Sequence, residues 1–340
     1  MLKVVISWPL APALVERIQA VSPEVNLRVL GVATNPGGPR GNFDQMQAQA
    51  TDQQMAEGFA EADVILCPYG AVAKRVPDLR AIAPKVSWVQ SIAAGADRMP
   101  QQLISEGVVF TTSSGVAAQP IAEFVLGHML MFSKGWPAFF RTQQAHEWRA
   151  GKRPADLSGH TVGIVGMGHI GSEVARLAHA FDCRVLGIRR SFTSRGPDEI
   201  ADEAVPPSEI NYLMAESDFV VLAAPLTPQT RGIVGVKEIA AMKPTAYLIN
   251  IARGGLVDEP ALVAALKEGR IAGAGLDVFA VEPLPAESEL WDMPNVIISP
   301  HSAGGSERSL ERTIDIFCGN LRRYLAGEPL LNIVDPERGY

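Results

Sequence analysis

The sequence contains few cysteines, and they lie far apart. Cys67, Cys183 and Cys318 are the three cysteines in 340 residues, and no two of them form a Cys-x-x-Cys pair. An odd number of widely spaced cysteines argues against a disulfide framework and against a zinc cluster, and it favours a reducing compartment. We therefore expect a cytoplasmic protein without a structural metal.

An excess of positive charge is also missing. The chain has 30 Lys and Arg against 37 Asp and Glu, its net charge is −7, and residues of both signs are interleaved. A broad basic surface for nucleic acid is therefore not expected, although the net charge does not exclude a local basic pocket.

Hydrophobic runs of membrane-spanning length are absent as well. The apolar stretch AEFVLGHMLMF (122–132) falls well short of the ~20 residues that a bilayer requires. The opening MLKVVISWPLAPAL has a weak signal-peptide pattern, but Pro9 and Pro12 interrupt its apolar part. A first strand followed by a loop is the preferred interpretation, and we expect a soluble protein with no membrane partner.

The chain does have length and apolar content. Its 340 residues, 47% of them hydrophobic, are enough for two domains. The 31 glycines and 25 prolines are spread along the chain, which indicates many short loops and argues against disorder.

Short apolar segments alternate with helical stretches in two consecutive series. The first series covers residues 3–8, 27–32, 62–67, 86–92 and 108–112, and the second covers 161–166, 184–188, 218–225, 246–251, 272–279 and 295–299. Such alternation predicts parallel sheets covered by helices on both faces. The fold class is therefore α/β, with two doubly wound parallel-sheet domains.

The segments between and after the two series suggest the domain boundaries. Residues 115–148 read as a long helical linker, and residues 307–327 form one more amphipathic helix that can return to the first domain. We predict a discontinuous domain of residues 1–117 and 302–340, and a second domain of residues 118–301.

A glycine-rich loop opens the second series. Gly166, Gly168 and Gly171 follow a predicted strand and precede a predicted helix. In a dinucleotide site the first glycine permits the tight turn, the second lets the backbone approach a pyrophosphate, and the third lets the helix pack against the strand. His169 would then neighbour the phosphate or face solvent. A glycine-rich turn without a ligand is the alternative.

The next strand ends in basic residues. An NAD-preferring site places Asp or Glu there to bind the ribose 2′-hydroxyl, whereas this chain has Arg189, followed by Arg190 and Ser191. A guanidinium can bind a 2′-phosphate bidentately, and the neighbouring residues add donors. The pattern predicts NADP(H), with NAD(H) bound at lower preference. Ordinary solvated charge at a strand end is the alternative.

Three polar residues follow the last strands of the second series. Arg253, Glu282 and His301 lie just beyond strand ends, and in open parallel sheets the ligand crevice lies outside those ends. Arg253 can hold a carboxylate and polarise the neighbouring carbonyl, and His301 can donate a proton to the developing alkoxide. Glu282 can orient the imidazole and favour its protonated form. This set suits reduction of a 2-keto acid, and a structural Arg–Glu pair beside a loop histidine is the alternative.

These motifs resemble the D-isomer-specific 2-hydroxyacid dehydrogenase family. The resemblance is carried by TVGIVGMGHIG, APLTPQTRGIV, LINIARGGLVDE, AGLDVFAVEPL and LWDMPNVIISPH, and more loosely by SWVQSIAAGADRM and GVAAQPIAEFVL. It implies a Rossmann cofactor domain and a flavodoxin-like substrate domain, with the active site in the cleft between them. Arg189 places the chain nearest the NADPH-dependent glyoxylate/hydroxypyruvate reductase branch.

The resemblance also implies roles for individual residues. Arg253, Glu282 and His301 would be catalytic, and Gly95 and Ala96 would join Arg253 in binding the substrate carboxylate. The cofactor-binding residues would be Gly166, Gly168, His169, Ile170, Gly171, Arg189, Arg190, Ser191, Pro225, Thr227, Ile251, Ala252 and Asp277, with Asp277 at the nicotinamide carboxamide. A homodimer would form through the segment with Trp136 and Trp148, and Trp148 would reach the partner's active site.

The resulting prediction is NADPH-dependent reduction of a small 2-keto acid, such as glyoxylate or hydroxypyruvate, to the D-2-hydroxy acid. One alternative is NAD-dependent oxidation of another small anion, of the formate or phosphite type, against which the arginines count. Another is a dinucleotide-sensing binding protein that resembles the C-terminal-binding corepressors. A turnover assay separates catalysis from sensing.

Overall fold

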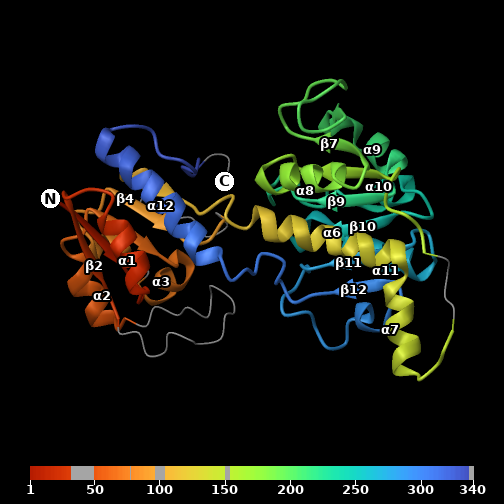
Figure 1. Cartoon of the computed structure of the whole chain (residues 1–340), viewed down its shortest axis with the longest axis horizontal. Helices are drawn as coiled ribbons and strands as arrows, with labels where there is room; N and C mark the ends of the chain where they lie inside the picture. The colour runs from red at the N-terminus through yellow and green to blue at the C-terminus, as the bar shows by residue number, and fades with distance from the viewer. Residues whose placement is uncertain (32–49, 77, 96–103, 150–153, 337–340) are drawn as a thin grey trace. The chain divides into compact units, whose positions relative to one another are not determined.

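The computed structural model describes residues 1–31, 50–76, 78–95, 104–149 and 154–336. The chain divides into two compact units, Met1–Ala117 with Gly305–Tyr340, and Ala118–Gly304 (Figure 1). Each unit has its own sheet and its own buried apolar core.

In the first unit the described strands form one parallel five-stranded sheet in the order β2-β1-β3-β4-β5. This is the strand order of flavodoxin-like folds. The strands are β1 (Leu2–Ile6), β2 (Val25–Val29), β3 (Val64–Cys67), β4 (Trp88–Ser91) and β5 (Val109–Thr111). The helices are α1 (Pro12–Gln19), α2 (Asp52–Phe59), α3 (Tyr69–Arg75), α4 (Leu79–Ile82) and α12 (Ser309–Ala326).

Helix α12 joins the first unit although it follows the second unit in sequence. Trp88 of β4 is fully buried and stacks on Phe317 and Tyr324 of α12, with ring centroids 5.3 and 5.4 Å apart. Ile314 and Leu321 of the same helix are also fully buried in this core. The apolar stripe of α12 therefore covers one face of the five-stranded sheet.

In the second unit the described strands form one parallel seven-stranded sheet in the order β12-β11-β10-β9-β6-β7-β8. The strands are β6 (Thr161–Val165), β7 (Arg184–Ile188), β8 (Glu203–Val205), β9 (Phe219–Leu222), β10 (Tyr247–Asn250), β11 (Gly273–Leu276) and β12 (Val296–Ile298). The helices are α6 (Ala118–Lys134), α7 (Trp136–Gln144), α8 (His169–His179), α9 (Ile210–Glu216), α10 (Val236–Ala241) and α11 (Glu259–Lys267). Short 3₁₀ turns are η2 (Pro207–Glu209), η3 (Gly254–Leu256) and η4 (Glu289–Asp292).

The strand order reverses between β6 and β9. From β6 the chain proceeds outward through β7 and β8, and it then returns to β9 and proceeds outward on the other side. In doubly wound sheets a ligand binds outside the carboxyl ends of the strands at such a switch point. The expected fold class, two parallel-sheet α/β domains, is confirmed.

Two local expectations differ from the structure. The single helical linker predicted over 115–148 is two helices, because Gly135 takes a left-handed conformation (φ 73°) and Pro137 lies in the first turn of α7. The three-residue edge strand β8 was not expected, since Glu203–Val205 lacks an apolar run and two prolines follow it. Among the described helices, none has the length and apolarity needed to cross a bilayer.

Candidate active site

The glycine loop lies at the switch point between β6 and β9. Gly166 has φ 110°, and a Cβ on it would lie 2.5 Å from the backbone nitrogen of Ala224, just beyond β9. A Cβ on Gly171 would overlap the carbonyl oxygen of Gly166. Both positions therefore require glycine for a reason internal to the fold.

Gly168 is different, because no atom lies within 4 Å of the place its Cβ would take. It precedes α8, whose first turn contains His169 and Ile170. Backbone N–H groups at the start of a helix attract anions, and an open glycine lets a phosphate approach them. The turn, the open approach and the close helix packing together fit a dinucleotide.

The predicted 2′-phosphate residues lie directly beside this loop. The carbonyl oxygen of Ile188, the last residue of β7, accepts hydrogen bonds from Gly166 N (3.0 Å) and Met167 N (2.9 Å). The chain then turns, with Phe192 N donating to Arg189 O at 2.9 Å. Arg189, Arg190 and Ser191 are all exposed in this turn.

The connection after β9 holds the other predicted cofactor residues, Pro225 and Thr227. Thr230 braces it: its hydroxyl donates to Pro225 O (2.6 Å) and accepts from Thr227 N (2.8 Å). Further along, Gly232 N donates to Gly255 O at 2.9 Å, so this connection is bonded to the one that follows β10.

Asn250 shapes the turn that carries Arg253. Its buried side chain accepts from Ala252 N (3.2 Å) and donates to Arg253 O (3.0 Å). Ile251 and Ala252 are buried, whereas Arg253 is half-buried, with Nη1 donating to Ala252 O at 2.7 Å. A cation is thus presented just beyond the carboxyl end of β10.

His301 and Glu282 form a direct pair. Nδ1 of His301 lies 2.7 Å from Oε2 of Glu282, and the side chains are 51% and 36% exposed. The other carboxylate oxygen of Glu282 accepts from Phe279 N at 3.0 Å, which limits rotation of the carboxylate. Since a carboxylate only accepts, Nδ1 carries the proton of this bond, and Nε2 is the nitrogen directed elsewhere.

Asp277 holds the turn in which His301 stands. Its buried carboxylate accepts from Ser299 Oγ (2.6 Å), Ser302 N (2.8 Å) and Ala303 N (3.0 Å), and its backbone oxygen accepts from His301 N (2.9 Å). His301 takes a left-handed φ of 50°, which a non-glycine residue adopts only when its surroundings hold it there. The predicted contact of Asp277 with nicotinamide stays a prediction, and the structure adds this turn-holding role.

His128 of α6 is buried against β11, the strand that Asp277 follows. Its ring occupies the space beside Gly275, where a Cβ would come within 2.5 Å of His128 Cδ2. Its Nδ1 lies 3.0 Å from Phe124 O. Burial lowers the pKa of His128 below its ordinary value, opposed by the bond to Phe124 and by the charge of Asp277.

Sequence reasoning missed Asn250, Thr230 and Ser299. Each fixes a turn through side chain–backbone or side chain–carboxylate bonds, and a lone polar residue at a strand end gives little sign of this. Among the substrate residues, Gly95 is exposed beyond β4 in the first unit, and Ala96 lies outside the described residues. Trp148 is fully exposed beyond α7.

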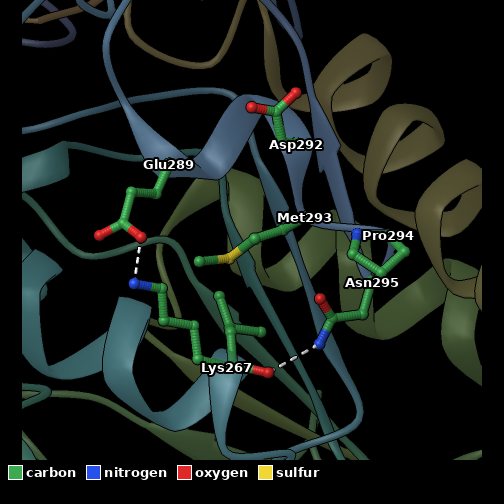
Figure 2. A pocket seen from close by; sticks show the side chains of 7 residues that line it. Lys267, Glu289, Asp292, Met293, Pro294 and Asn295 are labelled. Carbon is green, nitrogen blue, oxygen red and sulfur yellow. Dashed lines mark hydrogen bonds and ion pairs between the residues drawn. The ribbon is translucent and has the colours of Figure 1, made fainter.

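A pocket of about 520 Å³ in the second unit is lined by none of these residues, and Figure 2 shows the side chains that border it. It is bordered by Asn295, which precedes β12, and by the end of α11, where Lys267 pairs with Glu289. Asn295 Nδ2 donates to Leu266 O at 3.2 Å. Because it adjoins the beginning of a strand, this pocket is not at the carboxyl edge. Across the described part of the chain, no three His, Cys, Asp or Glu side chains are grouped to hold a metal.

Comparison with known proteins agrees with this geometry. Residues 126–303 match the family model for the NAD binding domain of D-isomer specific 2-hydroxyacid dehydrogenases. A glyoxylate reductase from Korarchaeum cryptofilum is 37% identical over 264 residues, which cover 75% of this chain and 78% of that protein. The chain belongs to the D-isomer specific 2-hydroxyacid dehydrogenase family. It is therefore an oxidoreductase with an NAD(P)-binding domain.

Two further members of the family show its breadth. A D-3-phosphoglycerate dehydrogenase from Methanocaldococcus jannaschii is 33% identical over 287 residues, which cover 84% of this chain but 54% of that longer protein. The solved NADPH-dependent glyoxylate/hydroxypyruvate reductase from Sinorhizobium meliloti, in complex with NADP and sulfate, is 28% identical, with a TM-score of 0.74 over the full length of both chains. The family thus includes members named for different substrates.

Proposed function

We propose that this protein uses NADPH to reduce a small 2-keto acid to the D-2-hydroxy acid. The observation that carries the proposal is the 2.7 Å bond between His301 and Glu282. It lies at the carboxyl edge of the same sheet that carries the glycine loop and Arg253. NADPH, when bound, supplies the hydride.

His301 is the proton donor in this proposal. Glu282 accepts a hydrogen bond from Nδ1 and fixes the ring, so Nε2 is the nitrogen that presents a proton to the carbonyl oxygen of the substrate. That proton would neutralise the alkoxide that develops on the substrate oxygen during reduction. The neutral His301 regains a proton from solvent, which its half-exposed ring permits.

Arg253 binds the other end of the substrate. A guanidinium matches the planar carboxylate of a 2-keto acid through two parallel hydrogen bonds. The Asn250 bonds to Ala252 and Arg253 fix the turn, so the cation is oriented before the substrate arrives. Binding the carboxylate places the neighbouring carbonyl in reach of one proton donor.

The cofactor is held by residues of the second unit. The open backbone at Gly168 and the start of α8 suit the pyrophosphate, and the exposed turn at Arg189, Arg190 and Ser191 suits a 2′-phosphate. The solved Sinorhizobium relative, which is described as NADPH-dependent and contains NADP, supports this choice. Glyoxylate and hydroxypyruvate are the first substrates to test, since relatives are named for them.

The proposal is tested with a panel of 2-keto acids assayed for NADPH oxidation, with the configuration of each product determined. We expect turnover with at least one acid and a D-product. The variant Arg253→Ala should raise KM for the acid and lower kcat while the Kd for NADPH stays unchanged. No turnover with any acid and either cofactor would overturn the proposal.

We also infer that the working unit is a homodimer formed through α7. None of the nine residues of this helix is buried, and Trp136 and Phe140 are 48% and 45% exposed. Their rings lie 5.5 Å apart on one side of the helix, and Trp148 follows it. An apolar helix side of this kind is suited to contact with a second copy.

A further inference from the structure

The loop between β7 and β8, residues 189–202, begins with the proposed 2′-phosphate residues. We call it the arginine loop. An exposed loop that binds a charged group gains affinity when it is ordered before the ligand arrives, because less conformational entropy is then lost on binding. The contacts that order this loop are therefore relevant to cofactor selection.

The loop is attached to the glycine loop at its start and lies near it at its end. At its start, Ile188 O accepts from Gly166 N and Met167 N. Near its end, Ala201 is buried beside Met167: a Cβ on Gly187 would lie 2.7 Å from Met167 Cγ and 3.2 Å from the Cβ of Ala201. Met167 and Ala201, which lies near the end of the arginine loop, therefore both border the space above Gly187.

The middle of the loop is held by Arg195. Its Nε lies 2.9 Å from Oε2 of Glu209, and its guanidinium carbon lies 4.4 Å from the ring centroid of Tyr212 at the start of α9. Next to it, Gly196 and Ala204 form an antiparallel bridge with hydrogen bonds of 2.7 and 3.3 Å. One arginine thus contacts a carboxylate and an aromatic face on a neighbouring element.

The aromatic partner is itself fixed. The hydroxyl of Tyr212 donates to Oε2 of Glu203 at 3.2 Å, and Glu203 pairs with Arg184 of β7 at 2.6 Å. Arg195 therefore contacts a network that is anchored in the sheet. Its charge is directed at Glu209 and Tyr212, and Arg189 occupies the turn six residues earlier in the chain.

We propose that Arg195 is a positioning residue for cofactor selection: by binding Glu209 and Tyr212, it orders the arginine loop so that Arg189 meets the 2′-phosphate. Arg195 itself does not touch the cofactor. The inference rests on the proposed function, in which Arg189 binds that phosphate. It assigns to Arg195 and Glu209 a contribution to discrimination between NADPH and NADH.

The test is the affinity of the full-length protein for 2′,5′-ADP and for 5′-AMP, which differ only in the 2′-phosphate, measured by calorimetry. Wild type should bind 2′,5′-ADP more tightly, and Arg189→Ala should remove most of that difference. Arg195→Ala should raise the Kd for 2′,5′-ADP by about threefold to tenfold, the scale of one exposed ion pair with one cation–π contact. Its Kd for 5′-AMP should not change, because that nucleotide has no 2′-phosphate for the arginine loop to bind.

Glu209 distinguishes positioning from direct binding. If Arg195 orders the loop, Glu209→Gln should raise the Kd for 2′,5′-ADP as Arg195→Ala does. The Kd of the double variant should then be no higher than that of Arg195→Ala. If Arg195 is instead a phosphate ligand, Glu209→Gln would free its guanidinium for the phosphate and lower the Kd for 2′,5′-ADP. That result would overturn the inference. Arg195→Lys keeps the ion pair without the planar stacking, so it should lie between wild type and Arg195→Ala.

Arg176→Ala is the matched control. It removes another exposed arginine that pairs with a carboxylate, Glu173 at 2.6 Å, in the same unit. Because salt screens the exposed charge of Arg176, the Kd values of this variant for both nucleotides should stay within about twofold of wild type. If Arg189→Ala behaves as expected but Arg195→Ala matches this control, the inference fails and the proposed function stands. If wild type binds both nucleotides equally, the 2′-phosphate site itself fails and the inference falls with it.

Discussion

His301 has a left-handed backbone conformation, which a non-glycine residue rarely adopts. Four hydrogen bonds to Asp277, from Ser299, His301, Ser302 and Ala303, hold the turn, and Glu282 then fixes the ring. The proton donor is thus oriented through two carboxylates with different tasks. Asp277 is buried and holds the backbone, whereas Glu282 is partly exposed and contacts the imidazole directly.

Replacing the imidazole should remove proton donation and leave the fold intact. We expect His301→Ala to lower kcat by ~10²–10⁴-fold, the usual contribution of a general acid, without changing the Kd for NADPH. His179→Ala serves as the control, since His179 is exposed on α8 and pairs with Asp202 at 3.1 Å. Steady-state kinetics and cofactor titration check both variants, and a near-normal kcat for His301→Ala would exclude it from the mechanism.

At the scale of elements, the glycine loop and α8 show how one motif combines two requirements. Gly166 and Gly171 are needed by the fold, because a side chain at either position would meet backbone atoms. Gly168 has open space around it and is needed only if something must approach. The motif can therefore be tested for structure and for binding separately.

Gly168→Ala should weaken NADPH binding by about tenfold or more while changing the free energy of unfolding by less than ~1 kcal/mol. Gly171→Ala should instead lower that free energy by about 1–3 kcal/mol, because its methyl group overlaps Gly166 O. Chemical denaturation and cofactor titration give both quantities. Strong NADPH binding by Gly168→Ala would contradict the proposed pyrophosphate site.

The buried histidine of α6 gives the second unit a defined response to acid. Because the folded-state pKa of His128 is lowered below 6.5 by burial, the unfolded chain binds more protons below that pH, and stability falls as pH decreases. We expect His128→Leu to show a shallower loss of stability between pH 7 and 5. Denaturation midpoints across pH check this, with Met129→Leu on the same helix as the control. Parallel pH profiles for wild type and His128→Leu would contradict it.

Regular alternation of apolar segments made the longer elements predictable from sequence. The five strands predicted for the first series and the six for the second occur in the structure, because buried parallel strands need continuous apolar runs. The edge strand β8 was not predicted, because three residues are too few to show an apolar alternation. The break at Gly135 escaped because a glycine inside a helical pattern is often tolerated, and its left-handed conformation appears only in the folded chain.

Part of the candidate site could also be predicted from the sequence. A parallel sheet brings strand ends to one edge, so the sequence predicts that Arg253, Glu282 and His301 follow strands at the same edge. The structure shows the Glu282–His301 bond, and the catalytic roles of the three residues stay predictions. What a strand pattern could not predict is how each turn is held. The bonds from Asn250, Thr230 and Ser299 depend on local backbone geometry, which only the folded chain defines.

At the scale of the whole molecule, α7 presents the clearest surface for a second copy. We expect the protein to sediment as a dimer at micromolar concentration, and the double variant Trp136→Glu with Phe140→Glu to sediment as a folded monomer. Stable interfaces bury about 800 Å² per partner, and two charges inside one would oppose its formation. Val236→Glu, at an exposed apolar residue of α10, is the control. A wild-type monomer, or a double variant that remains dimeric, would contradict the proposed interface.

The central claim is that this chain is an NADPH-dependent 2-keto acid reductase, and its most direct test is kcat/KM for NADPH and for NADH with one accepted acid. We predict a preference for NADPH of about tenfold or more, the scale of a charge-assisted bidentate contact between Arg189 and a 2′-phosphate. Arg189→Ala should remove most of that preference. Equal kcat/KM for the two cofactors in the unmodified protein would contradict the account.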